Sequence, residues 1–339
     1  MPCDAIRNTE ILMPGYLLLE ESTTWIQNPS KMRIAAIDVG TNTALLLVAE
    51  VAQDGTLVPL CQAQRFIRLG EGVDATRRVS EPAMQRLRTA LLEYRALAQT
   101  YGIAEIIVGA TSASRDAQNQ AALVEFVHRE TGLRYEILSG LEEATWSFRG
   151  ALSALDGLGG SCAVIDIGGG STEIVVGEAT GRIDARHSLD VGSVRLTERF
   201  FSNQPPTLFE IGRAEAFITH ALDEAAISLD ATTPLISAAE TPLLLALVDR
   251  GVSSWNELDP APVTLDADVV HHWRERLLAM TYNDVLALNP SLMTGRADVF
   301  PAAVLLFDTV LRHFGLSTCR VSPRSLRHGL ALRFVARHG

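Results

Sequence analysis

The chain has 339 residues, of which 47% are apolar, 20% charged and 6% aromatic, a composition that excludes disordered, fibrous and small disulfide-stabilised proteins. Acidic residues outnumber basic ones by 40 to 29, and the net charge of -11 argues against general binding to nucleic acid or to an anionic membrane. The four cysteines show no metal-ligand or CxxC spacing, and no apolar run reaches the length of a membrane span. We therefore expect a reduced, cytoplasmic protein with about two domains.

The predicted elements begin near Met32, because the preceding residues, 1–31, show no clear period. We expect this N-terminal extension to be disordered or to form one short surface helix. From there to residue 158, an antiparallel meander of three strands precedes alternating helices and strands, an order typical of an α/β domain. A helix begins after Ser80 and is stopped by Gly102. The other elements of this half are expected at 34–39, 44–51, 57–68, 105–108 and 135–138 for strands and at 116–131 and 141–155 for helices.

The opening pattern of the chain returns in its second half. Ile37–Gly40 (Ile-Asp-Val-Gly) is matched by Ile165–Gly168 (Ile-Asp-Ile-Gly), 128 positions later (166 minus 38), and a strand follows each glycine turn. This duplication predicts two similar lobes, 32–158 and 159–339, that face one another across a ligand cleft, with the last helix as a candidate to return to the first lobe. In the second lobe we expect a strand at 234–238 and helices at 194–201, 210–228, 242–250, 267–280, 298–314 and 324–337.

The glycine turns carry the clearest chemical signal. In Asp166–Glu173 (Asp-Ile-Gly-Gly-Gly-Ser-Thr-Glu), glycines without Cβ atoms let backbone N–H groups approach an anion, while the carboxylates suit a hard cation such as Mg²⁺ or Mn²⁺. One such turn alone could be a plain hairpin, but the second copy favours a clamp on a chain of phosphates. We expect phosphate binding by Gly40, Thr41, Asn42, Thr43, Gly168, Gly169, Gly170 and Ser171, and metal binding by Asp38, Asp166 and Glu173.

Together the two turns resemble those of the acetate and sugar kinase, Hsp70 and actin superfamily. Their residue sequences are similar to those of the exopolyphosphatase and guanosine pentaphosphate phosphohydrolase (Ppx/GppA) family. Five further segments agree with that family in family order: 68–73, 110–117, 138–144, 190–198 and 295–301. The resemblance runs from about Met32 to the end of the chain. It implies an α/β fold of two duplicated ribonuclease H-like (actin-like ATPase) lobes with mixed sheets flanked by helices and a ligand cleft between them.

The same resemblance implies a function. The family hydrolyses the terminal phosphoanhydride of inorganic polyphosphate with Mg²⁺ and releases orthophosphate; guanosine pentaphosphate is a second candidate substrate, K⁺ a candidate activating ion and a homodimer a candidate assembly. Glu143 would orient or deprotonate the attacking water, which fits a reaction that depends on positioning and charge neutralisation. A helix N-terminal carboxylate is the plain alternative for Glu143, and Glu142 is the second choice.

Arginines near the turns are further candidates. Arg115 follows a predicted strand, where its guanidinium could grip a phosphate at the cleft mouth; the alternative is an ion pair with Asp116 or another nearby acid. Arg68, Arg195 and Arg296 are weaker candidates for the same role. The histidines have no ligand-like set of partners around them in the sequence.

One segment departs from the family. Where most members have a Gly-Gly-Thr turn, this chain has Ala239-Glu240-Thr241, whose added side chains and charge should crowd or repel a nucleotide. This departure counts against a sugar or acid kinase of the superfamily, which is the first alternative function. A non-catalytic sensor that binds polyphosphate or an alarmone is the second alternative.

Overall fold

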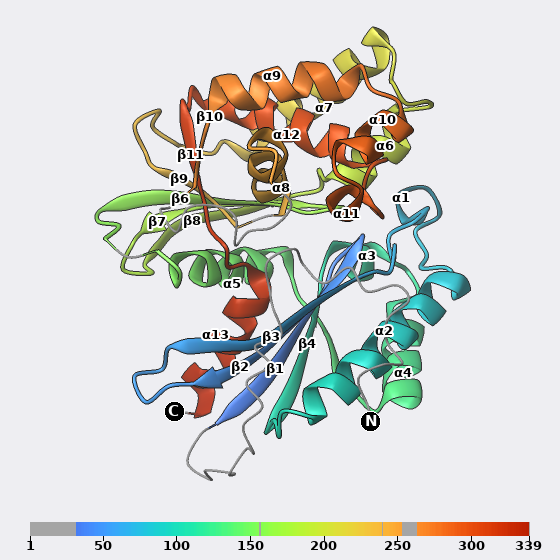
Figure 1. The fold of residues 1–339 in the computed structure, drawn as a ribbon, viewed down its shortest axis with the longest axis vertical. Coiled ribbons are helices and arrows are strands. Elements are labelled where there is room, and N and C mark those ends of the chain that lie inside the picture. Colours follow the sequence, from blue (N-terminus) through green and yellow to red (C-terminus); the bar gives the residue numbers. More distant parts are fainter. Residues whose placement is uncertain (1–31, 156, 239, 253–262, 339) are drawn as a thin grey trace.

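The computed structural model describes residues 32–338 except 156, 239 and 253–262, and it shows two mixed sheets, each flanked by helices (Figure 1). The expected N-terminal extension, 1–31, lies outside the described residues. In the first sheet the strand order is β3-β2-β1-β4-β5, antiparallel from β3 to β1 and parallel from β1 to β5. Its strands are β1 (Arg33–Val39), β2 (Thr43–Val51), β3 (Leu57–Phe66), β4 (Glu105–Ala110) and β5 (Tyr135–Ile137).

The second sheet repeats this arrangement, in the order β10-β11-β9-β6-β7-β8. Strands β8-β7-β6 are antiparallel and β6-β9-β11 are parallel, so they correspond one by one to the strands of the first sheet, and β10 is an extra edge strand. The prediction of a duplicated, two-lobed α/β fold is confirmed. The strands are β6 (Ser161–Ile167), β7 (Thr172–Glu178), β8 (Ile183–Leu189), β9 (Leu235–Ser237), β10 (Thr264–Asp266) and β11 (Thr318–Val321).

Helices on the outer face of the first sheet follow the predicted apolar spacing. The Ser80 hydroxyl accepts the Ala83 amide at the start of α2, and Leu87 and Leu91 are buried against the sheet. The helix expected at 116–131 is wrong at its start, because the chain forms a separate short helix before Asn119 and the longer helix begins only at Gln120. The helices are α1 (Val73–Thr76), α2 (Glu81–Gln99), α3 (Ser112–Asp116) and α4 (Gln120–Thr131).

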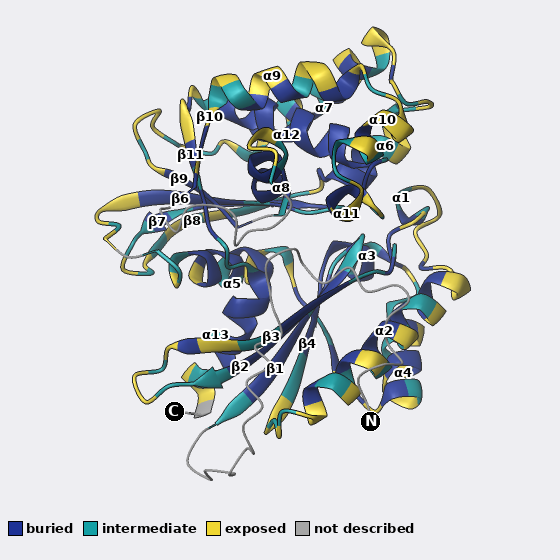
Figure 2. Cartoon of the chain, viewed as in Figure 1, coloured by how far each residue is buried: buried dark blue, intermediate teal, exposed yellow. Residues whose placement is uncertain are grey.

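The second lobe has the larger core, centred on a buried helix, α12, which packs on four neighbouring helices. In Figure 2 most of α12 is dark blue, which marks buried residues, whereas the outer faces of the surrounding helices carry the yellow of exposed residues. Among the described residues, no helix combines the length and apolarity needed to cross a membrane. The helices are α6 (Ser193–Phe200), α7 (Leu208–Ala225), α8 (Glu240–Asp249), α9 (Ala267–Leu278), α10 (Tyr282–Leu288), α11 (Pro290–Met293) and α12 (Phe300–Phe314).

Two helices, α5 (Gly140–Leu152) and α13 (Leu326–His338), lie between the sheets and pack on one another (Figure 1). Helix α5 belongs to the first half of the chain, yet Phe148 packs in a cluster with Val164 of the second sheet. Helix α13 comes from the second half, and Leu330 packs with Ile34 of the first sheet. Each half of the chain therefore supplies one helix to the other sheet, and α5 reaches the cleft with its N-terminus.

Candidate active site between the two glycine turns

The two glycine turns have the same backbone geometry. The Gly40 amide donates a hydrogen bond to the Thr43 carbonyl at 2.8 Å, and the Gly168 amide donates to the Ser171 carbonyl at 2.9 Å. These two pairs are separated by the same 128 positions as the sequence motifs (168 minus 40, 171 minus 43). The duplication therefore extends to the hydrogen bonds that shape the turns.

Carbonyl groups of both turns accept hydrogen bonds from neighbouring backbone segments, whereas several amides of the turns donate none to a described residue. The carbonyls of Thr41 and Asn42 accept hydrogen bonds from the segment that follows β3, and those of Gly168 and Gly169 accept from the start of α6. Their donors are the amides of Ile67, Arg68, Gly70, Ser193, Val194 and Arg195. Within the described part of the chain, no acceptor is found for the amides of Thr41, Asn42, Gly169 and Gly170. Unpaired amides in consecutive turn positions form an anion-binding concavity.

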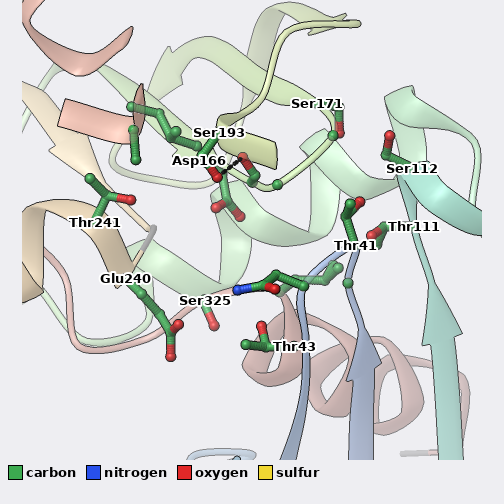
Figure 3. Close-up of a pocket in the computed structure, with 18 of the residues that line it drawn as sticks. Thr41, Thr43, Thr111, Ser112, Asp166, Ser171, Ser193, Glu240, Thr241 and Ser325 are labelled. Carbon is green, nitrogen blue, oxygen red and sulfur yellow. Dashed lines mark hydrogen bonds between the residues drawn. The ribbon is translucent and has the colours of Figure 1, made fainter. Parts of the chain in front are cut away.

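The turns face one another across a cavity of about 130 Å³, which both of them line (Figure 3). A Cβ atom added to Gly169 would lie 2.9 Å from Cβ of Thr41, so glycine is required for this close approach. The Thr41 hydroxyl is buried and has no hydrogen-bond partner among the described residues. The expected meeting of the duplicated turns is present in the structure.

Acidic side chains surround the cavity. Asp38, Glu143 and Asp166 line it, whereas Glu173 does not and instead accepts a hydrogen bond from the Ser188 hydroxyl at 2.7 Å. Glu173 faces Asp166 across the β6–β7 ladder. The described residues contain no cluster of three acidic, histidine or cysteine side chains already arranged around one metal position. The three expected metal ligands thus divide into two that line the cavity and one that lies outside it.

Burial and mutual repulsion raise the pKa values of these carboxyl groups. Burial raises the pKa of Asp38 well above its usual value, and the charges of Glu143 and Asp166 raise it further. Burial also raises the pKa of Asp166, although the hydrogen bond from Ser147 opposes this. No described residue donates a hydrogen bond to Asp38. Carboxylates this close together are stabilised by a cation between them.

Glu143 and Glu142 have different environments despite being adjacent. Glu142 forms a capping box with Ser139 at the start of α5, which lowers its pKa. Glu143 is only 7% exposed, points to the cavity and accepts a hydrogen bond from Nη1 of Arg115 at 2.8 Å. Burial raises the pKa of Glu143 to about 7, while Arg115 opposes the shift. Both glutamates lie in the first turn of α5, but Glu142 caps the helix whereas Glu143 lines the cavity.

Arg115 does not line the cavity. Its guanidinium donates to Glu143, to the Leu138 carbonyl at 3.1 Å and to the Ser171 hydroxyl at 3.4 Å. The alternative of an ion pair with a nearby acid describes these contacts, and the acid is Glu143. Arg115 is therefore placed to orient the carboxylate.

A hydrogen-bonded group of three side chains, of which Glu240 and Arg296 line the cavity, was not predicted as a group from the sequence. Glu240 lines the cavity, and its Oε2 accepts hydrogen bonds from Gln64 at 3.0 Å and from Arg296 at 3.2 Å. Nη2 of Arg296 also donates to Gln64 at 2.9 Å. Glu240 occupies the segment that replaces the Gly-Gly-Thr turn, and Ala239 lies outside the described residues. Polar Gln64 on an inward-facing position of β3 was the available signal.

The other two arginine candidates join the lobes at the rims of the cleft. Arg68 pairs with Asp298 at 2.7 Å. Arg195, only 6% exposed, donates to the Gly170 carbonyl at 2.8 Å and pairs with Asp74 and Asp116 of the first lobe. These contacts hold the second turn against the first lobe.

Two duplicated lobes with facing anion-binding turns and a buried carboxylate cluster define a phosphate-handling protein of the actin-like ATPase fold. A model of the Ppx/GppA phosphatase family matches residues 47–338. The chain belongs to the Ppx/GppA phosphatase family.

Characterised relatives and solved structures agree with this assignment. Exopolyphosphatase 2 of Mycobacterium tuberculosis is 35% identical over 318 residues, covering 88% of this chain and 98% of the relative. Exopolyphosphatase 1 of Mycobacterium leprae is 27% identical and covers 89% of both chains. The crystal structure of the Aquifex aeolicus family member is 27% identical, with a TM-score of 0.75 over 91% of this chain and 99% of that one. An exopolyphosphatase from Cytophaga hutchinsonii is 26% identical, with a TM-score of 0.81 over 90% and 98%.

Proposed function

We propose that this protein is an exopolyphosphatase, which hydrolyses the terminal phosphoanhydride of inorganic polyphosphate and releases orthophosphate. The observation that carries the proposal is the pair of facing turns, whose unpaired amides border a cavity that also holds Glu143. The exopolyphosphatase relatives support the same substrate. The enzyme would work in the cytoplasm, and guanosine pentaphosphate is a second substrate to be tested.

Phosphate groups would bind to main-chain amides of the two turns. The amides of Thr41, Asn42, Gly169 and Gly170 have no described acceptor, and the Thr41 hydroxyl lies among them. These donors suit phosphate oxygens, because amide hydrogen bonds to an oxyanion are short and stronger than neutral ones. Gly40, Thr43, Gly168 and Ser171 would shape the turns through their 2.8 and 2.9 Å hydrogen bonds.

A divalent cation such as Mg²⁺ or Mn²⁺ fits between Asp38 and Asp166. Their oxygen atoms are hard ligands, both side chains line the cavity, and burial raises the pKa of both carboxyl groups, a shift that a bound cation would oppose. When bound, the cation would neutralise negative charge on phosphate oxygens. Glu173, which lies outside the cavity, would influence the cation through Asp166, its neighbour on the adjacent strand.

Glu143 would be the general base. A pKa of about 7 allows the carboxylate to accept a proton near neutral pH, and the Arg115 guanidinium fixes one of its oxygens. A water oxygen would attack the terminal phosphorus, its proton would pass to Glu143, and the anhydride P–O bond would break. The products are orthophosphate and a chain that is one phosphate shorter.

The decisive assay measures phosphate release from long polyphosphate, short polyphosphate and guanosine pentaphosphate, with and without K⁺. Glu143→Gln should fold and bind polyphosphate but lose about 100-fold or more in kcat, as expected for removal of a general base. Glu142→Gln is the matched control and should retain activity, because that side chain only caps α5. Equal activity of wild type and Glu143→Gln would contradict the role of Glu143 as the base, and the absence of phosphate release by wild type would contradict the proposed function.

The same purified protein distinguishes the two alternative functions, a kinase and a non-catalytic sensor. A kinase would form ADP from ATP in the presence of an acceptor faster than it releases phosphate from polyphosphate, yet Glu240 places a carboxylate in the wall of the cavity, which disfavours a nucleotide there. A sensor would bind polyphosphate tightly without turnover. Buried Glu143, held by Arg115 beside the turns, favours hydrolysis over simple binding.

A further inference from the structure

Helix α5 presents two polar side chains to the site. Ser147 follows Glu143 by four positions, so both lie on the same face of the helix. Glu143 reaches the cavity, while Ser147 is 1% exposed and donates its hydroxyl hydrogen to Oδ2 of Asp166 at 2.6 Å. Hydrogen bonds of this length from a hydroxyl to a carboxylate are charge-assisted and strong.

A hydroxyl group in the interior of a helix can bond to the carbonyl four residues earlier. Thr145 does so, because its hydroxyl donates to the Leu141 carbonyl at 2.7 Å. Ser147, two residues further along the same helix, donates to the carboxylate instead. Serine is also a weaker helix former than alanine, and the contact with Asp166 offsets the cost of placing a hydroxyl in this buried helix face.

The contact distinguishes the two aspartates that the duplication makes equivalent. Asp38 and Asp166 end the first strand of each sheet at the same position of the repeat. No described residue donates a hydrogen bond to Asp38, whereas Asp166 is held at Oδ2 and its Oδ1 receives no hydrogen bond from any described group. One carboxylate is therefore oriented before anything binds.

We infer that Ser147 is a positioning residue, which fixes Asp166 so that Oδ1 is presented to the divalent cation. Asp166 is then the oriented ligand, and Asp38 adjusts to the cation when it arrives. This inference rests on the proposed function, since it assigns Ser147 a role in the cation site described there. Partners that orient a metal ligand in this way typically contribute about 10- to 100-fold in metal affinity.

The test measures Mn²⁺ binding to the substrate-free protein by electron paramagnetic resonance and titration calorimetry. Ser147→Ala should bind Mn²⁺ about 10- to 100-fold more weakly than wild type. Thr145→Ala removes a hydroxyl from the same helix without touching a carboxylate and should bind like wild type. Ser147→Thr, which keeps the hydroxyl, should recover most of the affinity.

A double-mutant cycle makes the result specific to the pair. In a chain that carries Asp166→Ala, the further change Ser147→Ala should leave Mn²⁺ affinity unaltered, because the oxygen that accepts the Ser147 hydroxyl hydrogen is already gone. If wild type and Ser147→Ala bind Mn²⁺ equally, or if Ser147→Ala lowers only the thermal stability, the inference is overturned while the proposed function stands. If wild type does not bind Mn²⁺ at all, the cation role in the proposed function fails with it.

Discussion

The first and second glycine turns have the same backbone but different side-chain surroundings. Both close with an amide-to-carbonyl hydrogen bond, of 2.8 and 2.9 Å, and both follow a strand that ends near an aspartate. Opposite the aspartate, the first sheet has Leu45, whereas the second has Glu173. Ser147 supports Asp166, and no described residue supports Asp38 in the same way. The two turns thus share one backbone geometry, whereas the proposed catalytic side chains lie around the second turn.

The packing of α5 explains why this asymmetry concerns the second turn. The helix is made from the first half of the chain but packs on β6, β7 and β8 of the second sheet. It therefore carries both Glu143 and Ser147 to Asp166, and Arg115 reaches Glu143 from the first lobe. In the first sheet the equivalent helix is α13. Its first residue, Leu326, and the preceding Ser325 line the cavity, and neither has a carboxylate. In the proposed mechanism both turns therefore bind phosphate, while Glu143 and the oriented Asp166 lie beside the second turn.

The largest effect is expected from filling the space between the turns. Gly169→Ala would place a Cβ atom 2.9 Å from Thr41 and force the turns apart, so we expect about a 100-fold loss in kcat/KM for polyphosphate. Gly212→Ala is the matched control, because that glycine has open space around it, and it should retain full activity. Normal turnover by Gly169→Ala would show that the facing turns do not hold the substrate.

A smaller effect should separate the two aspartates. Asp166→Asn and Asp38→Asn should both weaken Mn²⁺ binding, and the loss should be roughly tenfold greater for Asp166, because that ligand is oriented in advance by Ser147. Titration of each variant with Mn²⁺ gives the comparison directly. Equal losses would mean that the two turns contribute the same to the cation site.

The smallest effect concerns the pH dependence of the base. Glu143 must be deprotonated to accept a proton, so kcat/KM should rise with pH through about 7. The Arg115 ion pair lowers the pKa of Glu143, and its removal in Arg115→Met should therefore move this rise to higher pH. Rate profiles from pH 5 to 9 provide the measurement. A midpoint that stays fixed or moves to lower pH would contradict the assigned pairing.

Local sequence patterns predicted the parts of the fold that depend on local spacing. Both turns, their strands and most helices were expected close to their observed positions, because apolar alternation and capping residues act within a few positions. Strands β8, β10 and β11 were missed, since they are short or half-exposed and lack a clear alternating apolar signal.

The side-chain contacts within the site could not be predicted in the same way. The Ser147–Asp166 and Gln64–Arg296 contacts join residues that are 19 and 232 positions apart, and they exist only because α5 and the two sheets pack as they do. The contact of Arg115 with Glu143 likewise joins residues that are 28 positions apart, and no pattern in the sequence pairs them. Motifs predicted which residues would carry chemistry, and tertiary packing determines which of them touch.

The most direct test is a crystal structure of Glu143→Gln with a short polyphosphate and Mg²⁺, since this variant should bind substrate without hydrolysing it. The account predicts phosphate oxygens within hydrogen-bond distance of amides from both turns, with Mg²⁺ between the phosphates and the carboxylates of Asp38 and Asp166. A polyphosphate bound outside the cavity, or contacting one turn alone, would contradict it.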